Sequence, residues 1–115
     1  MRKMLVHKEV VMQNHYKITS ILHSGNYGKR GMPRTDGRYP SRLNRIIEIN
    51  DHVCNGSIQI GYPIVAKYIK DKNGNDLWQY YFHTSLVVDW DFICEDVIRV
   101  ETLNTIYEFE RVKEK

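Results

Sequence analysis

The residues of this sequence best suited to chemistry are arginines that recur through one glycine-rich segment. They are Arg30, Arg34, Arg38, Arg42 and Arg45. A guanidinium group binds phosphate or carboxylate through two parallel hydrogen bonds. The glycines between the arginines let backbone N–H groups approach an anion closely. We therefore predict that these five arginines contact the phosphate of an anionic ligand.

The positive charge of the chain is concentrated in this segment. From Lys29 to Arg45 there are six basic residues and one acid, Asp36, which give a net charge of +5. Because the whole chain carries +3, the remainder sums to −2. Such local asymmetry bears on partners rather than on fold. Two alternatives stay open: a solvated, mobile loop, or arginines that pair with the acids of residues 89–96.

Aromatic residues offer a second kind of ligand contact. Tyr39 lies inside the basic segment and Trp78 opens an aromatic run, so we predict that both stack on a base. If the run is a strand, Trp78, Tyr80 and Phe82 share one face, and Tyr81 lies on the other. One face must be core. The opposite face is a candidate stacking platform beside the basic loop, or its rings only pack across strands.

Known catalytic and cofactor motifs are not found in the sequence. It has no G-x-x-x-x-G-K-[ST] and no G-x-G-x-x-G after a strand. Its histidines and cysteines are not at metal-ligand spacing, so we expect neither a metal nor a cofactor. We expect a binding protein rather than an enzyme. The alternative is an enzyme acting on a phosphorylated substrate, with His83 or Asp89 as the base.

Length and composition indicate one small globular domain. The 115 residues are 42% hydrophobic and 27% charged, which is an ordinary balance for a chain that folds around a core. No long apolar run predicts a membrane helix, and residues 1–13 make a poor signal peptide, so we expect a location in the cytoplasm. Cys54 and Cys94 are expected to be free, partly buried thiols, with a single disulfide as the alternative.

The pattern of the chain predicts a mainly β fold, either one antiparallel sheet or a partly closed barrel of six or seven strands. We expect a peripheral extension over residues 1–15, with Met12 as an alternative start, and a β domain over 16–112. The expected strands are 16–22, 43–49, 57–69, 76–83 continuing through 84–90, 97–102 and 105–112. Residues 23–42 are expected to form a long loop because their glycines and prolines disfavour a helix. Residues 89–96, rich in acids, are expected to form a loop or a single helical turn.

Three short runs resemble a group of small uncharacterised proteins from phages and prophages of Gram-positive bacteria. They are a G-R-Y-P-x-R stretch at 37–42, a T-S-x-V stretch at 84–87 and a T-x-N-[ST]-x-Y-x-F stretch at 102–109. The resemblance covers about residues 16–111 and implies a phage or prophage context, without an activity to carry over. By analogy, small phage proteins often counter host defence by sequestering a signalling nucleotide or by blocking a defence protein.

These observations lead to one expected function and two alternatives. The expected function is a phage-type counter-defence protein that captures an anionic, phosphorylated ligand such as a cyclic or ADP-ribose-type signalling nucleotide, with no membrane partner and with homo-oligomerisation as a further expectation. One alternative is an inhibitor that docks on a host defence protein or its nucleic acid, in the manner of an anti-CRISPR protein. The other alternative is a β protein that binds nucleic acid directly.

Overall fold

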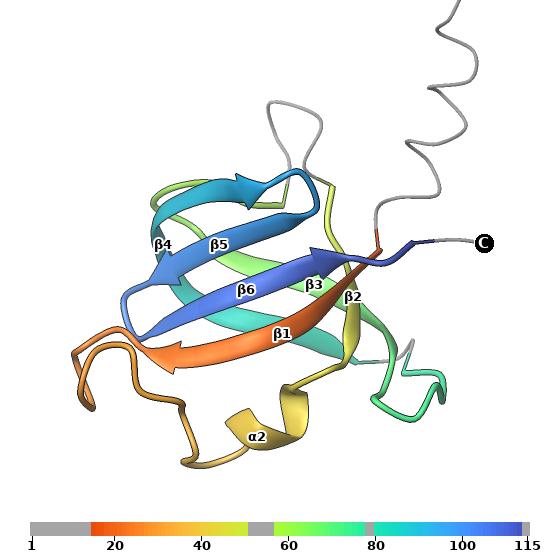
Figure 1. The fold of residues 1–115 in the computed structure, drawn as a ribbon, viewed down its shortest axis with the longest axis horizontal. Helices are drawn as coiled ribbons and strands as arrows, with labels where there is room; N and C mark the ends of the chain where they lie inside the picture. The colour runs from red at the N-terminus through yellow and green to blue at the C-terminus, as the bar shows by residue number, and fades with distance from the viewer. Residues whose placement is uncertain (1–14, 51–56, 78–79, 114–115) are drawn as a thin grey trace, which may run out of the picture.

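The computed structural model describes residues 15–50, 57–77 and 80–113. Six antiparallel strands form one sheet that closes in a ring, and one short helix lies outside it beside β1 (Figure 1). The elements are β1 (His15–His23), α2 (Tyr39–Arg42), β2 (Ile46–Glu48), β3 (Pro63–Lys70), β4 (Tyr81–Cys94), β5 (Val97–Thr102) and β6 (Thr105–Arg111). The predicted mainly β, antiparallel class is confirmed.

Strand order in the ring follows chain order, and the ring closes because β1 pairs with β6. The β5–β6 hairpin turns at Leu103 and Asn104, as the sequence predicts. A turn over residues 71–75 joins β3 to the segment before β4. Its Asp71 N–H and Gly74 N–H donate to Asn75 O and Asp71 O, and Gly74 takes the positive φ of 89° that favours glycine.

Apolar side chains that alternate along the strands fill the inside of the ring. In β3 the pattern is regular, because Ile64, Ala66 and Tyr68 point inward between exposed neighbours. An aromatic cluster lies at the centre, where the Phe82 ring meets the ring of Tyr107 edge-on at 5.2 Å. Burial raises the pKa of Tyr107 to about 12, so this ring stays neutral in the core.

A register shift in β1 changes which of its side chains face the core. Strict alternation places Ser20 on the same face as Tyr16 and Ile18. The pairing of β1 with β6 shifts between Ile18 and Ser20. After this bulge Ile21, rather than Ser20, turns inward and is buried.

Strand β4 is longer than the sequence analysis predicts. The loop or helical turn expected at 89–96 is wrong, because β4 continues to Cys94 and pairs with β5 throughout this stretch. Only the two acids Glu95 and Asp96 form the turn. The local sequence explains why the strand continues. Asp89 and Asp91 alternate with Trp90 and Phe92, and this period of two is typical of a strand with one acidic face in solvent.

Two predicted strands are shorter in the structure. The strand expected over 43–49 begins only at Ile46, because Asn44 adopts a left-handed φ of 67° that breaks extended backbone. The strand expected over 57–69 begins only at Pro63, since Gly61, with a φ of 93°, stands in a turn. Leu77 and Tyr80, the described residues nearest before Tyr81, are likewise not in a strand, and Tyr80 is exposed whereas Phe82 is buried.

Some expectations lie outside the described residues: those for the N-terminal extension with Met12, for Cys54 and for Trp78. Cys94 is a free thiol but is exposed rather than partly buried, because it ends β4 at the rim of the sheet. Among the residues that the structure describes, no helix has the length and apolar character needed to cross a membrane.

Candidate anion-binding groove

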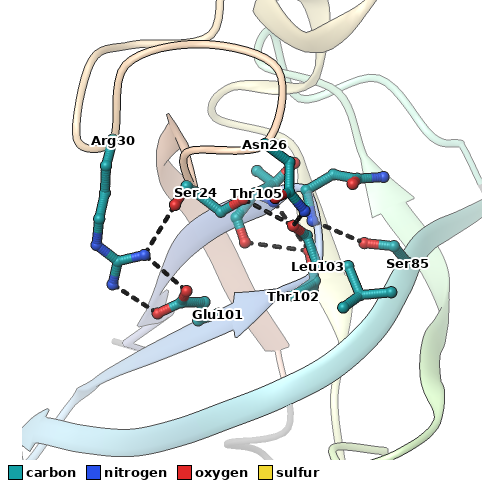
Figure 2. A network of polar contacts seen from close by, with 9 residues as sticks. Ser24, Asn26, Arg30, Ser85, Glu101, Thr102, Leu103 and Thr105 are labelled. Carbon is teal, nitrogen blue, oxygen red and sulfur yellow. Dashed lines mark hydrogen bonds and ion pairs between the residues drawn. The ribbon is translucent and has the colours of Figure 1, made fainter.

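The basic segment divides into two halves with different surroundings. In the first half, Arg30 forms a bidentate ion pair with Glu101 on β5, with two N···O distances of 2.7 Å. The same guanidinium donates to the backbone oxygen of Ser24 at 2.9 Å. Figure 2 shows this arginine reaching from the loop to the strand below it. The hydrogen bond from Arg30, followed by its charge, lowers the pKa of Glu101.

Arg34 is buried and its hydrogen-bonding capacity is almost filled. Its Nε and Nη2 atoms donate to the two carboxylate oxygens of Asp36. Its Nη1 atom donates to the backbone oxygen of Asn104 at 3.1 Å and to the Thr105 hydroxyl at 3.0 Å. The guanidinium also lies 4.0 Å from the centre of the Tyr39 ring. Arg34 therefore fixes the loop to the β5–β6 turn and has little capacity left for a ligand.

Further polar contacts tie the loop to the same turn. The Ser24 hydroxyl donates to the backbone oxygen of Leu103 at 2.7 Å, and the Asn26 side-chain amide donates to the same oxygen (Figure 2). A Cβ atom at Gly28 would lie 2.6 Å from atoms of the His23 ring, so glycine is needed where the loop crosses this ring. The first half of the basic segment is thus held in place by its own contacts.

The second half of the segment forms one side of an open groove of about 440 Å³. Among the described residues, its lining is formed by three arginines, three tyrosines, a serine and a leucine: Arg38, Ser41, Arg42, Arg45, Tyr68, Leu77, Tyr80 and Tyr81. The arginines come from the turn that holds α2 and from the residues leading into β2. Tyr68 comes from β3, Tyr80 immediately precedes β4, and Tyr81 begins it.

Local structure explains why the arginines converge here. Pro40 at the start of α2 fixes a single helical turn, which places Arg38 and Arg42 at its two ends. The left-handed backbone at Asn44 then redirects the chain, so that Arg45 faces the same groove. A helix through the whole basic segment would have spread these side chains along one long face.

Two of these guanidinium groups lie over the faces of tyrosine rings. Arg42 lies 4.9 Å from the centre of the Tyr39 ring, and Arg45 lies 4.8 Å from the centre of the Tyr68 ring. A face contact of this kind leaves the N–H edges of the guanidinium open to an anion. Among the described residues, neither these two arginines nor Arg38 forms an ion pair with an acid.

Negative charge stands outside the groove lining. The pKa of Asp71 is lowered first by the backbone N–H of Asn75 and, as the smallest cause, by the charge of Arg45. Two lining tyrosines, Tyr80 and Tyr81, each expose 56% of their surface. The groove therefore presents positive charge and open aromatic faces together.

The predicted site residues are thus only partly brought together. Arg38, Arg42 and Arg45 share the groove, whereas Arg30 and Arg34 are engaged with acids of the chain itself. Tyr39, predicted to stack on a base, packs against the core and carries two guanidinium groups, and it does not line the groove. Trp78 lies outside the described residues.

Other lining residues were not predicted as site residues. Tyr81 lies on the face opposite Phe82, which the sequence analysis names as a candidate stacking platform. Strand alternation therefore predicts its position. Tyr68 and Ser41 have no such signal, because only the pairing of β2 with β3 and the turn at α2 bring them to the arginines.

The alternative in which the loop arginines pair with the acids of residues 89–96 is wrong, because the described loop arginines that form ion pairs do so with other acids. Asp96 pairs instead with Arg111 at 3.4 Å and with Lys113 at 2.6 Å. The partners of the two engaged loop arginines are Glu101 and Asp36.

Groups suited to catalysis or to metal binding do not gather at the groove. His83 and Asp89, the candidates for a base, are both exposed on β4 and are not part of the groove lining. Within the described ranges, no three His, Cys, Asp or Glu side chains come together as a metal site. The chemistry that the groove offers is electrostatic and stacking contact.

Comparison of the chain with protein-family models, with curated proteins and with solved structures found no match.

Proposed function

We propose that the protein binds a phosphorylated ligand with an aromatic ring, of the nucleotide class, in the groove beside α2. The observation that carries the proposal is the convergence of Arg38, Arg42 and Arg45, without an acid partner among the described residues, next to the exposed rings of Tyr80 and Tyr81. Guanidinium groups suit phosphate, and tyrosine faces suit a base.

The three arginines of the groove differ in how firmly their side chains are held. Arg42 and Arg45 are held by ring contacts, so they lose little side-chain freedom when a phosphate binds to their open edges. Arg38 is exposed at the rim and adds charge without a fixed position. The volume of about 440 Å³ lies within the roughly 300–1,000 Å³ of small-molecule sites.

A thermal-shift panel tests this proposal. Nucleoside mono- and diphosphates, cyclic nucleotides and ADP-ribose are compared with adenosine, which lacks phosphate. We expect at least one phosphorylated compound in large excess to raise the melting temperature by several degrees, and adenosine to leave it unchanged. The shift should disappear in R42Q/R45Q and persist in R99Q, a matched control whose arginine pairs with Glu108 outside the groove. No shift from any phosphorylated compound would contradict the proposal.

Salt dependence separates a nucleotide from a strand of nucleic acid. If all five predicted arginines engaged a single strand, the log–log slope of affinity against salt would approach about −3.5. With only the three groove arginines engaged, a slope of about −2 is expected for a short oligonucleotide. A steeper slope, measured by fluorescence anisotropy, would favour a nucleic-acid-binding protein with a larger footprint than the groove.

The counter-defence role is a separate proposal, supported only by the resemblance to phage and prophage proteins. If it holds, sequestering a signalling nucleotide needs no catalytic group, which agrees with a groove built for electrostatic and stacking contact. Expression of the chain in a host that carries a nucleotide-signalling defence system, with R42Q/R45Q as control, tests this role. Equal protection by both variants would contradict it.

A further inference from the structure

A second hollow, of about 490 Å³, lies next to the groove and is open to solvent. Its lining includes two lysines, two asparagines, an isoleucine and an acid: Lys17, Lys72, Asn44, Asn73, Ile46 and Asp71. They come from β1, from the start of β2 and from the turn at 71–75. In Figure 1 the chain that leads into β2 runs between α2 and this turn. We call this second site the lysine hollow.

Three consecutive residues form the wall between the groove and the lysine hollow. Arg45 lines the groove, whereas its two neighbours, Asn44 and Ile46, line the lysine hollow. Consecutive Cα atoms lie about 3.8 Å apart, so a single stretch of backbone separates the two sites. A ligand held by Arg45 in the groove can therefore extend over this wall into the lysine hollow.

The chemistry of the lysine hollow differs from that of the groove. Lys17 and Lys72 are exposed, and within the described part of the chain neither forms an ion pair. Asn44 and Asn73 add side-chain amides, and the described lining contains no aromatic ring. Ammonium and amide groups bind phosphate and sugar oxygens, whereas a base is bound by stacking on a ring. The lysine hollow therefore fits the backbone of a nucleic acid rather than a base.

The acid of this lining is occupied within its own turn. One carboxylate oxygen of Asp71 accepts the backbone N–H groups of Asn73 and Asn75 at 2.8 and 2.9 Å. The other oxygen accepts the side-chain amide of Asn75 at 3.2 Å. These hydrogen bonds fix the backbone of the turn, so the segment that carries Lys72 is organised before a ligand binds.

The positive charge of this surface ends at Lys17. A third hollow, of about 360 Å³, shares Lys17 with the lysine hollow and is also lined by Glu110, Arg111 and Lys113. Both of its further cations pair with Asp96, at 3.4 and 2.6 Å. Among the described residues around the three hollows, the cations without an acid partner therefore lie over the groove and the lysine hollow. This limits the length of a ligand that they can hold.

We propose that the ligand is a short single-stranded oligonucleotide of at least two nucleotides, with its first nucleotide in the groove and its second phosphate in the lysine hollow. This inference rests on the proposed function, because the groove must bind the first nucleotide. A mononucleotide reaches only one of the two sites. In a dinucleotide the second contact becomes intramolecular, and the affinity rises without any change in the groove.

Isothermal titration of the full chain with oligonucleotides of increasing length tests this inference. The probes are the 5′-phosphorylated mono-, di- and tetranucleotides of deoxyadenosine and of thymidine. In at least one series we expect the dinucleotide to bind at least about tenfold more tightly than the mononucleotide, because a second phosphate gains charge-assisted contacts. The tetranucleotide should add no more than about threefold, which is the statistical gain from its three dinucleotide registers.

Two double variants connect this gain to the lysine hollow. K17Q/K72Q should bind the mononucleotide as wild type does and should lose the gain of the dinucleotide. K29Q/R99Q is the matched control, because it removes two positive charges from outside both sites and should keep the gain. Circular dichroism checks folding, and the single variants K17Q and K72Q, each expected to lose part of the gain, replace the double variant if it does not fold.

The outcomes separate this inference from the proposed function. A dinucleotide that binds no more tightly than the mononucleotide would overturn the inference and leave the proposed function standing. An equal gain in K17Q/K72Q and wild type, or a tetranucleotide far tighter than the dinucleotide, would overturn it as well. If no member of either series binds, the inference is overturned, and the thermal-shift panel decides separately whether the groove takes another nucleotide.

Discussion

At the scale of single residues, the surroundings of an arginine decide what it does. Arg34 and Arg42 belong to the same basic segment, and both contact the Tyr39 ring. Arg34 is buried among acceptors of the chain, so its role is structural. Arg42 has the ring on one side and the groove on the other, so its hydrogen-bonding edge is open to a ligand.

This difference predicts opposite effects of two substitutions. Arg34→Ala leaves the Asn104 oxygen and the Thr105 hydroxyl without their donor, which should destabilise the fold by about 1–3 kcal/mol. Arg38→Ala, at an exposed position, should change the free energy of unfolding by less than about 0.5 kcal/mol. Urea denaturation measures both values. Equal stability of the two variants would mean that Arg34 is not an anchor of the loop.

At the scale of elements, the basic loop and the β5–β6 hairpin act as one unit. The bidentate contact of Arg30 with Glu101 joins the two, and contacts to Leu103 close the other end (Figure 2). Because these contacts use the loop's own polar groups, its first half is preorganised before any ligand binds.

The ion pair between Arg30 and Glu101 predicts a dependence of stability on pH. The pKa of Glu101 is held below its ordinary value of 4.5 in the folded chain. Its contribution to stability is therefore fully present above the unfolded pKa and is lost as the pH falls through the lowered folded pKa. E101Q should be less stable than wild type at pH 7, and the difference should shrink towards pH 3. Urea midpoints at both values measure this change, and a difference that grows on acidification would contradict the assignment.

The elements also show where sequence patterns suffice and where they do not. The turn residues at 71–75 and 103–104 predict two chain reversals, whereas the inward face of β3 is seen only in the structure. The acid content of residues 89–96 favours a loop, whereas the structure shows that Asp89 and Asp91 belong to a strand. The bulge after Ile18 depends on pairing with β6, which lies about 90 residues away, so local sequence does not reveal it.

At the scale of the whole molecule, the pairing of β2 with β3 and of β3 with β4 brings the parts of the candidate site together. The groove joins the loop before β2 with the end of β3 and the start of β4, so its tyrosines and arginines are far apart in sequence. The charge count predicts that the segment from Lys29 to Arg45 is basic, yet it does not reveal which arginines have acid partners. That division depends on the positions of Glu101 and Asp36 in the fold.

Isothermal titration calorimetry tests the central claim most directly, with the nucleotide that gives the largest thermal shift as ligand. We expect wild type and R99Q to bind it equally, and R42Q/R45Q to bind it at least about tenfold more weakly, because two charge-assisted contacts are removed. Equal affinity of R42Q/R45Q and wild type, or a loss of affinity in R99Q as large as in R42Q/R45Q, would contradict a binding site in the groove beside α2.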